Sequence, residues 1–408
     1  MSTPDGPSLQ RRLGTFDAVT IGLGSMIGAG IFVALTPAAA AAGSGLLIGL
    51  SIAAVVAYCN ATSSARLAAR YPQSGGTYVY GRERLGEFWG YTAGWSFVVG
   101  ETASCAAMAL TVGYYVWPEW AHAVAVAAVV ALTALNYTGI KKSAVLTRII
   151  VAVVLAVLAA VVVVILGFGD VDGSRLAVGD DVSIGGVLES AGLLFFAFAG
   201  YARIATLGEE VRDPARTIPR AIPIALGIAL VVYAVVAIAV LSELGSATLA
   251  SATAPLAQAV VAAGMPGLEP VVRAGAAVAA LGSLLALILG VSRTVLAMAR
   301  DRHLPPALAV VHPRFASPHR AEIAVGVVVA VVAAVVDVRG AIGFSSFAVL
   351  LYYAIANASA WTLGARVIPA LGLASCLLLA FSLPLQSVLI GAGVVVIGAA
   401  VYAVRRLR

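Results

Sequence analysis

The sequence predicts an all-α polytopic membrane protein with twelve transmembrane helices. Of the 408 residues, 61% are hydrophobic and 11% are charged, whereas about a quarter of the residues of an ordinary soluble domain are charged. The apolar residues gather in runs of about 20, the length that a helix needs to cross a roughly 30 Å hydrocarbon core. These runs lack the two-residue alternation of barrel strands, so we expect helices.

Polar connections separate the apolar runs, and short tails at residues 1–14 and 405–408 flank them. The connection 71–84 is long enough for an interfacial turn. The segment 246–267 is weakly apolar at its centre and is predicted to form a short helix over the outer mouth. The expected spans are 15–41, 45–69, 87–116, 119–137, 145–168, 185–208, 220–242, 269–299, 321–338, 341–364, 367–383 and 386–404.

The distribution of Lys and Arg predicts the orientation in the membrane. Positively charged connections stay in the cytoplasm, and most Lys and Arg residues fall in alternate connections. Only Arg175, Arg273 and Arg339 lie on the opposite side, together with the acidic loop 168–184. We therefore expect a multi-pass protein of the plasma (inner) membrane with both termini in the cytoplasm.

Composition and missing motifs exclude several classes of protein. The low charge excludes a soluble enzyme and a nucleic-acid-binding module. No HExxH motif, P-loop, CxxC pair or GxSxG motif occurs, so we expect neither an enzyme nor a process driven by ATP in this chain. His303, His312 and His319 share one loop, but their spacing is not that of a compact zinc site. No metal and no cofactor is expected, and three cysteines within apolar runs imply no disulfide framework.

Two spans contain interruptions. The first span carries Gly22, Gly24, Gly28 and Gly30, and the sixth carries Gly200, although glycine costs about 1 kcal/mol relative to alanine within a helix. Interrupted helices in corresponding halves of a chain are typical of a binding site near the membrane midplane. The alternative interpretation is close helix packing through small residues.

A broken helix frees backbone N–H groups on one side and carbonyl groups on the other. The N-terminus of the second half-helix favours a carboxylate, and the freed carbonyls accept hydrogen bonds from an ammonium group. A zwitterionic α-amino acid presents both groups. Two facing interruptions can therefore hold its backbone whatever its side chain.

Four motifs extend this pattern over nearly the whole chain. They are GSMIGAGIF, YPQSGGTYVY, FFAFAGYARIATLGEE followed by VRDPARTIPRAIP, and MARDRHLPPALAVVHPRFASP. Together they resemble the amino acid–polyamine–organocation (APC) permease superfamily. The resemblance implies a LeuT-like fold with two inverted repeats of five helices, 15–168 and 185–364, in which helices 1 and 6 are broken. Residues 367–404 would form two peripheral helices.

The resemblance also implies a secondary active amino acid transporter that works by alternating access. Proton-coupled symport of small or medium amino acids is the leading interpretation, and an exchanger of amino acids, amines or polyamines is the alternative. The expected partners are the amino acid, protons and membrane lipids, without nucleic acid.

Carried over to this sequence, the resemblance implies a substrate site formed by both interruptions. Backbone N–H groups around residues 28–30 would bind the carboxylate, and carbonyls of residues 25–27 would accept from the amine. Phe196 or Tyr201 would act as an aromatic gate. The expected substrate-binding residues are Ser25, Met26, Ile27, Gly28, Ala29, Gly30, Phe196, Ala197, Phe198, Ala199, Gly200 and Tyr201.

Two departures from the family pattern concern the coupling ion. Many proton-coupled members carry a lysine in span five, and this chain has Val154 at that position. Span eight keeps only Ser283 where sodium-coupled relatives have several hydroxyl groups. The sequence therefore lacks the lysine of many proton-coupled members and most of the hydroxyl groups of sodium-coupled relatives.

Glu101 and Arg203 lie inside spans three and six, where an ionised side chain costs about 2.5–3.5 kcal/mol or more. Our hypothesis is that Arg203 replaces the missing lysine charge, and that Glu101 pairs with it or carries the proton. A structural ion pair, or a contact between Arg203 and an anionic group of the substrate, are the alternatives. Asn136 and Asn357 are expected to form hydrogen bonds between helices.

Overall fold

A computed structural model describes residues 13–71, 75–138, 144–179, 182–201, 204, 211–315 and 317–406. Within these ranges the protein is helical and contains no strand beyond an isolated bridge between Leu13 and Val211. The all-α prediction is confirmed for this part of the chain. Ten helical segments among these residues are long and apolar enough to cross a membrane.

The first half of the chain begins with an interrupted span. Helix α1 (Thr15–Met26) stops two residues before α2 (Ala29–Val33), and α3 (Leu35–Ala42) completes the span. A short helix, α5 (Thr77–Leu85), forms in the connection where an interfacial turn is expected. The other helices of this half are α4 (Leu46–Arg70), α6 (Glu87–Val116), α7 (Ala121–Tyr137) and α8 (Ala144–Phe168).

The second half begins with α9 (Ile184–Phe198), which leads into a short 3-10 turn, Ala199–Tyr201. The short helix predicted within 246–267 is confirmed as α12 (Pro255–Ala262). The remaining helices are α11 (Pro214–Ser251), α13 (Glu269–Arg300), α14 (His319–Val335), α15 (Val338–Trp361), α16 (Val367–Ser382) and α17 (Leu385–Arg406). Two of the twelve expected spans, α14 and α16, have only 17 and 16 residues, which explains why ten helices meet the length for crossing.

Side-chain caps and prolines position several helix starts. Ser183 accepts a hydrogen bond from the Gly186 N–H group (3.0 Å) at the start of α9, and Asp337 accepts one from Gly340 N–H (2.8 Å) at the start of α15. Such caps satisfy N–H groups that have no partner within the helix. Pro214 occupies the first turn of α11, where its missing N–H group costs nothing.

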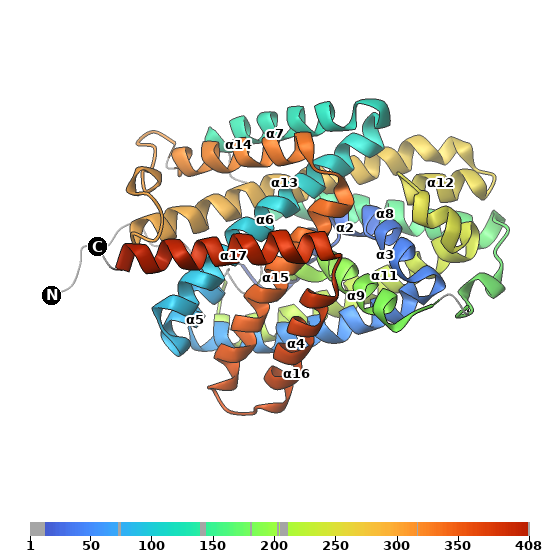
Figure 1. Cartoon of the computed structure of the whole chain (residues 1–408). Coiled ribbons are helices and arrows are strands. Elements are labelled where there is room, and N and C mark those ends of the chain that lie inside the picture. The colour runs from blue at the N-terminus through green and yellow to red at the C-terminus, as the bar shows by residue number, and fades with distance from the viewer. Residues whose placement is uncertain are drawn as a thin grey trace.

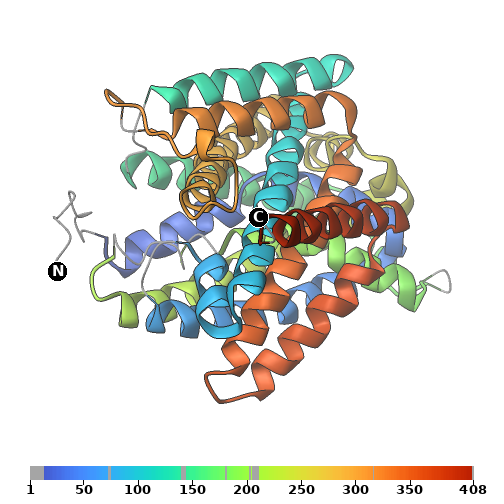
Figure 2. The same cartoon turned by 60° about the vertical axis from the view of Figure 1, so that its left-hand side comes forward.

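The helices run between two ends of the molecule. At one end lie α5, the loop 301–315 and the last turn of α17, and at the other end lie α12 and the connection that follows α8 (Figure 1). Helices α7 and α14 lie side by side along one edge in both views (Figures 1 and 2). Helix α6 packs against α13 and α15, and α4 packs against α9 and α11. The interrupted segment α2 contacts α6, α9 and α13, so it lies in the interior.

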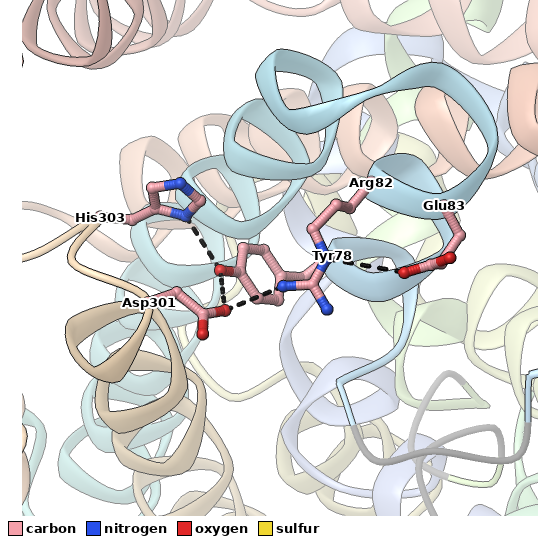
Figure 3. A network of polar contacts seen from close by, with 5 residues as sticks. All are labelled: Tyr78, Arg82, Glu83, Asp301 and His303. Atoms are coloured by element: carbon pink, nitrogen blue, oxygen red, sulfur yellow. Dashed lines mark hydrogen bonds and ion pairs between the residues drawn. The ribbon is translucent and has the colours of Figure 1, made fainter. Parts of the chain in front are cut away.

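A polar network ties α5 to the residues that follow α13 (Figure 3). The Tyr78 hydroxyl donates to Asp301 Oδ2 (2.5 Å) and lies 2.9 Å from His303 Nδ1, while Arg82 donates to the same Asp301 oxygen (3.0 Å). Because a phenol has one proton and Tyr78 gives it to Asp301, His303 Nδ1 is assigned as the donor to Tyr78. Burial is the main cause that raises the pKa of Tyr78, so the phenol keeps the proton that it donates.

The His303 imidazole predicts a pH dependence of stability. Burial lowers its pKa, and the Asp301 carboxylate opposes this effect only in part. An unfolded chain therefore binds a proton at this side chain more readily than the folded protein, so stability falls as the pH drops below the ordinary histidine pKa of about 6.5. The difference in thermal unfolding between the unsubstituted protein and His303→Gln, followed from about pH 7.5 to about pH 5.5, isolates this contribution.

The loss should be smaller in His303→Gln than in the unsubstituted protein. His122→Gln is the matched control, because it replaces a histidine outside the network and should keep the full loss. Equal pH dependence of His303→Gln and the unsubstituted protein would contradict the assignment.

Candidate functional site

The first interruption is a tight turn between α1 and α2. The Ile27 N–H group donates to Leu23 O (2.7 Å), and Gly28 N–H donates to Met26 O (2.8 Å). Gly28 N–H is thus occupied. The N–H groups of Ala29 and Gly30 lie in the first turn of α2, where no partner exists within the helix. These two groups are the donors that the interruption offers.

The second interruption lies at the 3-10 turn after α9, and side chains of other helices satisfy its carbonyls. Ala197 O accepts from Tyr233 of α11 (2.9 Å), and Ala199 O accepts from Tyr353 of α15 (3.0 Å). Tyr201, a predicted gate, is fully buried, and its ring stacks on that of Tyr353 at 5.2 Å. Arg203 lies outside the described residues.

The two interruptions touch each other through glycines. A Cβ atom on Gly30 would lie 2.7 Å from Ala197 Cα, and one on Gly200 would overlap the Ser25 carbonyl. A Cβ atom on Gly28 would overlap the Ser283 hydroxyl of α13. Only glycine allows backbone to approach this closely. The structure thus brings the expected residues of both spans together at one place.

Tyr233 joins the two interruptions directly. Its hydroxyl lies 2.6 Å from Met26 O and 2.9 Å from Ala197 O, so one proton is shared between one carbonyl of each interrupted span. The side chain is fully buried, and its ring packs edge-on against Phe198. Sequence reasoning missed Tyr233. The signal was one tyrosine in the apolar run IALVVYAVVAIAV, because a buried tyrosine hydroxyl needs a hydrogen-bond partner.

Glu101 lies on the side of α6 that packs against α15. It is 7% exposed, and its charge acts on the phenols of Tyr352 and Tyr353. One turn further along α6, the Ser104 hydroxyl pairs with that of Ser345 of α15 at 2.6 Å.

Neither Val154 nor Ser283 supplies a charge beside the first interruption. Val154 of α8 is fully buried in the apolar core. The Ser283 hydroxyl donates to Gly24 O (3.1 Å), so it holds the backbone of α1 just before the interruption.

Buried amides connect the surrounding helices, as the sequence predicts. Asn357 of α15 donates to Asn60 of α4 (2.6 Å) and accepts from Ser63 (2.6 Å), and Asn136 of α7 donates to Leu285 O of α13 (3.2 Å). The predicted interhelical hydrogen bonds of Asn136 and Asn357 are confirmed. Within the described ranges, no group of three or more His, Cys, Asp or Glu side chains is placed to hold a metal ion. The arrangement is suited to noncovalent binding by backbone groups.

Comparison with known proteins points to one family. A profile of the amino acid permease family matches residues 17–397. The chain is 72% identical over 405 residues to an uncharacterized transporter of Mycobacterium tuberculosis. The matched residues make up 98% of this chain and 92% of that transporter. It is 26% identical over 343 residues to the branched-chain amino acid permease of Bacillus subtilis, and the match covers 78% of this chain and 73% of that permease. It is 28% identical over 353 residues to the methylthioribose transporter of the same organism, and this match covers 81% of this chain and 76% of that transporter.

Substitution of the glycines tests the contact between the interruptions. Gly200→Ala meets the backbone of Ser25, which has no side-chain freedom to yield, and should destabilise the protein by about 1–3 kcal/mol. Gly28→Ala meets the side chain of Ser283, so the added substitution Ser283→Gly should restore part of the loss. Thermal unfolding in detergent measures both effects.

Gly227→Ala is the matched control for these variants, because nothing lies within 4 Å of a Cβ atom at this position of α11. It should leave stability unchanged or raise it by up to about 1 kcal/mol, since alanine favours a helix over glycine. A Gly200→Ala variant as stable as Gly227→Ala would contradict the packing of the two interruptions.

Removal of the Tyr233 hydroxyl takes a donor away from the buried Ala197 carbonyl, while Met26 O keeps its hydrogen bond from Gly28 N–H. We expect Tyr233→Phe to lower the free energy of unfolding by about 1–3 kcal/mol. Tyr58→Phe, which removes a hydroxyl from a side chain that is 52% exposed, should have little effect. Equal thermal unfolding of the two variants would show that the Tyr233 bridge contributes nothing.

Proposed function

The chain belongs to the amino acid permease family, and we propose on that premise that it moves amino acids across the plasma membrane by secondary active transport. Family membership and the relatives make it a transporter, and the bacterial relatives agree with an integral membrane protein. The proposed mechanism is alternating access. The contact between two interrupted helices in the interior of the bundle is the observation that carries this proposal.

The proposed architecture is LeuT-like. Residues 15–168 and 185–364 would form two inverted repeats of five helices, residues 367–404 would add two peripheral helices, and both termini would lie in the cytoplasm. Three features support this arrangement. The interruptions fall in the first and sixth spans, they contact each other, and α5, the loop 301–315 and the C-terminal end of α17 share one end of the molecule (Figure 1).

The proposed substrate site uses backbone groups of both interruptions. Ala29 and Gly30 N–H, at the positive end of a helix, would bind the substrate carboxylate. Carbonyls of residues 25–27 and 196–201 would accept hydrogen bonds from the ammonium group, which would compete with the Tyr233 hydroxyl for Met26 O and Ala197 O. Phe196 or Tyr201 would close over the substrate.

The substrates proposed are amino acids with small or medium, neutral side chains. Met26, Ala197 and Ala199 at the interruptions are apolar and buried. The named relatives carry different solutes, among them branched-chain amino acids, so family membership supports an amino acid without fixing its side chain. Glu101 is the carboxylate that lies near the second interruption, and a cationic substrate would need more acidic groups than this one.

Proton-coupled symport is the leading proposal for the energy source, with Glu101 as the proton carrier or as the partner of Arg203. Exchange of one amino acid, amine or polyamine for another is the second candidate. One observation favours exchange: Val154, at the position where many proton-coupled members carry a lysine, is buried among apolar side chains. An exchanger needs no coupling ion.

Uptake of radiolabelled amino acids into proteoliposomes tests the function. We expect uptake of small or medium neutral amino acids that an inward proton gradient accelerates. Uptake only into liposomes preloaded with amino acid would favour the exchanger. No uptake of any amino acid in either mode would contradict the proposal.

The same liposomes test Glu101. Glu101→Gln should remove the stimulation by the gradient and leave exchange between labelled and unlabelled amino acid intact, because the amide cannot carry a proton. Glu119→Gln, at an exposed position, is the matched control and should retain the stimulation. Unchanged stimulation in Glu101→Gln would exclude this carboxylate from coupling.

A further inference from the structure

Glu322, in the first turns of α14, is a buried carboxyl group outside the site described above. Its side chain is 0% exposed, and neither Oε1 nor Oε2 has a hydrogen-bond partner among the described residues. None of the ion pairs found within 4.0 Å in these residues includes it. An ionised carboxylate in such a place is unfavourable by far more than a neutral one.

Two further polar atoms without partners lie along the contact between α7 and α14. They are Thr133 Oγ1 of α7 and His319 Nδ1 at the start of α14, both buried from solvent. A Cβ atom on Gly326 would lie 2.5 Å from Thr133 Oγ1, and the His319 ring lies 6.0 Å from the Tyr137 ring. Residues 319, 322 and 326 share one face of α14. Glu322 therefore faces α7 between Thr133 and Tyr137.

Apolar side chains and few charges surround this place. Ala321 and Val325 belong to a buried apolar cluster with residues of α6, α7 and α13, including Cys105. Arg293 of α13 is the charged group that acts on Glu322. Four other titratable groups belong to this part of α14 or to the segments near it, namely Tyr137 of α7, His319 of α14, His312 of the preceding loop, whose ring lies 5.2 Å from that of His319, and Cys105 of α6. Arg293 acts on Glu322 through its charge and is itself exposed.

We propose that Glu322 is a proton-binding site, that His319 delivers its proton from the aqueous end formed by the loop 301–315, and that its protonation state controls the rate of transport. The last part rests on the proposed transport function. Four buried polar atoms without partners, three within one turn of α14 and one on the facing helix α7, call for a ligand or water, since such atoms are rare in native proteins. A proton is the ligand that this set of groups accommodates.

The proton step needs no other reactant. His319 takes a proton from water at one ring nitrogen and releases the proton of the other, Nδ1, to a water molecule that passes a proton on to a Glu322 oxygen, because no direct hydrogen bond joins the two side chains. The carboxylate becomes a carboxylic acid, and the imidazole returns to its neutral form as the other tautomer. Thr133 offers a hydroxyl group to the acid from the side of α7.

A metal cation fits this place poorly. Oxygen-binding cations such as Ca²⁺ take six or more oxygen ligands, whereas Glu322 and Thr133 are the side chains with free oxygens here. The positive charge of Arg293 acts on the same place and opposes a second cation. Loss of the proton would leave the negative charge of the Glu322 carboxylate beside the apolar cluster. Because that charge is unfavourable there, it would loosen the packing of α14 on α7 and α13.

Infrared spectroscopy of the purified protein tests the site without any substrate. At about pH 7 the unsubstituted protein should show a carboxylic-acid carbonyl band that shifts in D₂O and disappears at alkaline pH. Glu322→Gln, which keeps the shape of the side chain, should lack this band, and Glu119→Gln should retain it. Absence of the band from the unsubstituted protein, or an equal band in Glu322→Gln, would overturn the proposal.

Stability and exchange provide independent readouts. Because the folded protein holds this proton at a pH at which an unfolded chain has lost it, stability should fall as the pH rises, and Glu322→Gln should remove this fall. Amino acid exchange should slow when the pH rises on the side of the membrane where the loop 301–315 lies. In Glu322→Gln it should not. Equal pH dependence of exchange in the unsubstituted protein and in Glu322→Gln would refute the control of transport by Glu322. Absence of amino acid exchange in every variant and in the unsubstituted protein would refute the proposed function, and the infrared result would then decide the proton site.

Discussion

The contact of Gly30 with Ala197 and of Gly200 with Ser25 is the constraint on which the rest of the bundle depends. The two spans can approach this closely only because one residue of each contact is a glycine, and here the regular helical hydrogen bonds of each span are also interrupted. In hydrocarbon no water replaces them, and each unsatisfied group costs several kcal/mol. Neighbouring helices therefore have to bring donors to the freed carbonyls. Tyr233 of α11 and Tyr353 of α15 do so, which fixes how these two helices lie against α1 and α9.

This compensation is one-sided. Hydroxyl groups satisfy the carbonyls of Met26, Ala197 and Ala199, whereas no helical partner exists for the N–H groups of Ala29 and Gly30. An anionic group finds donors ready, while an ammonium group has to share carbonyls that already accept hydrogen bonds. The asymmetry favours solutes with a carboxylate over simple amines. It thus supports an amino acid as substrate more strongly than a polyamine.

Much of this arrangement could be predicted from the sequence, because glycine density and family motifs report on backbone geometry. The sequence could predict three of its features: the interruption of the first span, the glycines that line it and the hydrogen bonds of Asn357. Tyr233 was not, because its role depends on which carbonyls its hydroxyl meets across three helices. Glu322 follows a polar loop in the sequence and resembles an ordinary charged helix start. Its burial becomes visible only when α7 and α13 pack against it.

Glu101 and Glu322, two of the three buried carboxyl groups in the described part of the chain, differ in the side of the membrane with which they can exchange protons. Glu101 is buried on α6, which packs against α15, the helix that carries Tyr353 to the second interruption. In the proposed mechanism, the substrate pathway opens to each side of the membrane in turn and would connect Glu101 to both. Glu322 lies beside the loop at one end and receives protons through His319 from that end alone. A carboxyl group that exchanges protons with one side cannot move them across the membrane, whereas one that exchanges with both sides can. In the proposed mechanism, coupling would therefore belong with Glu101, and Glu322 would adjust the rate to the pH of one compartment.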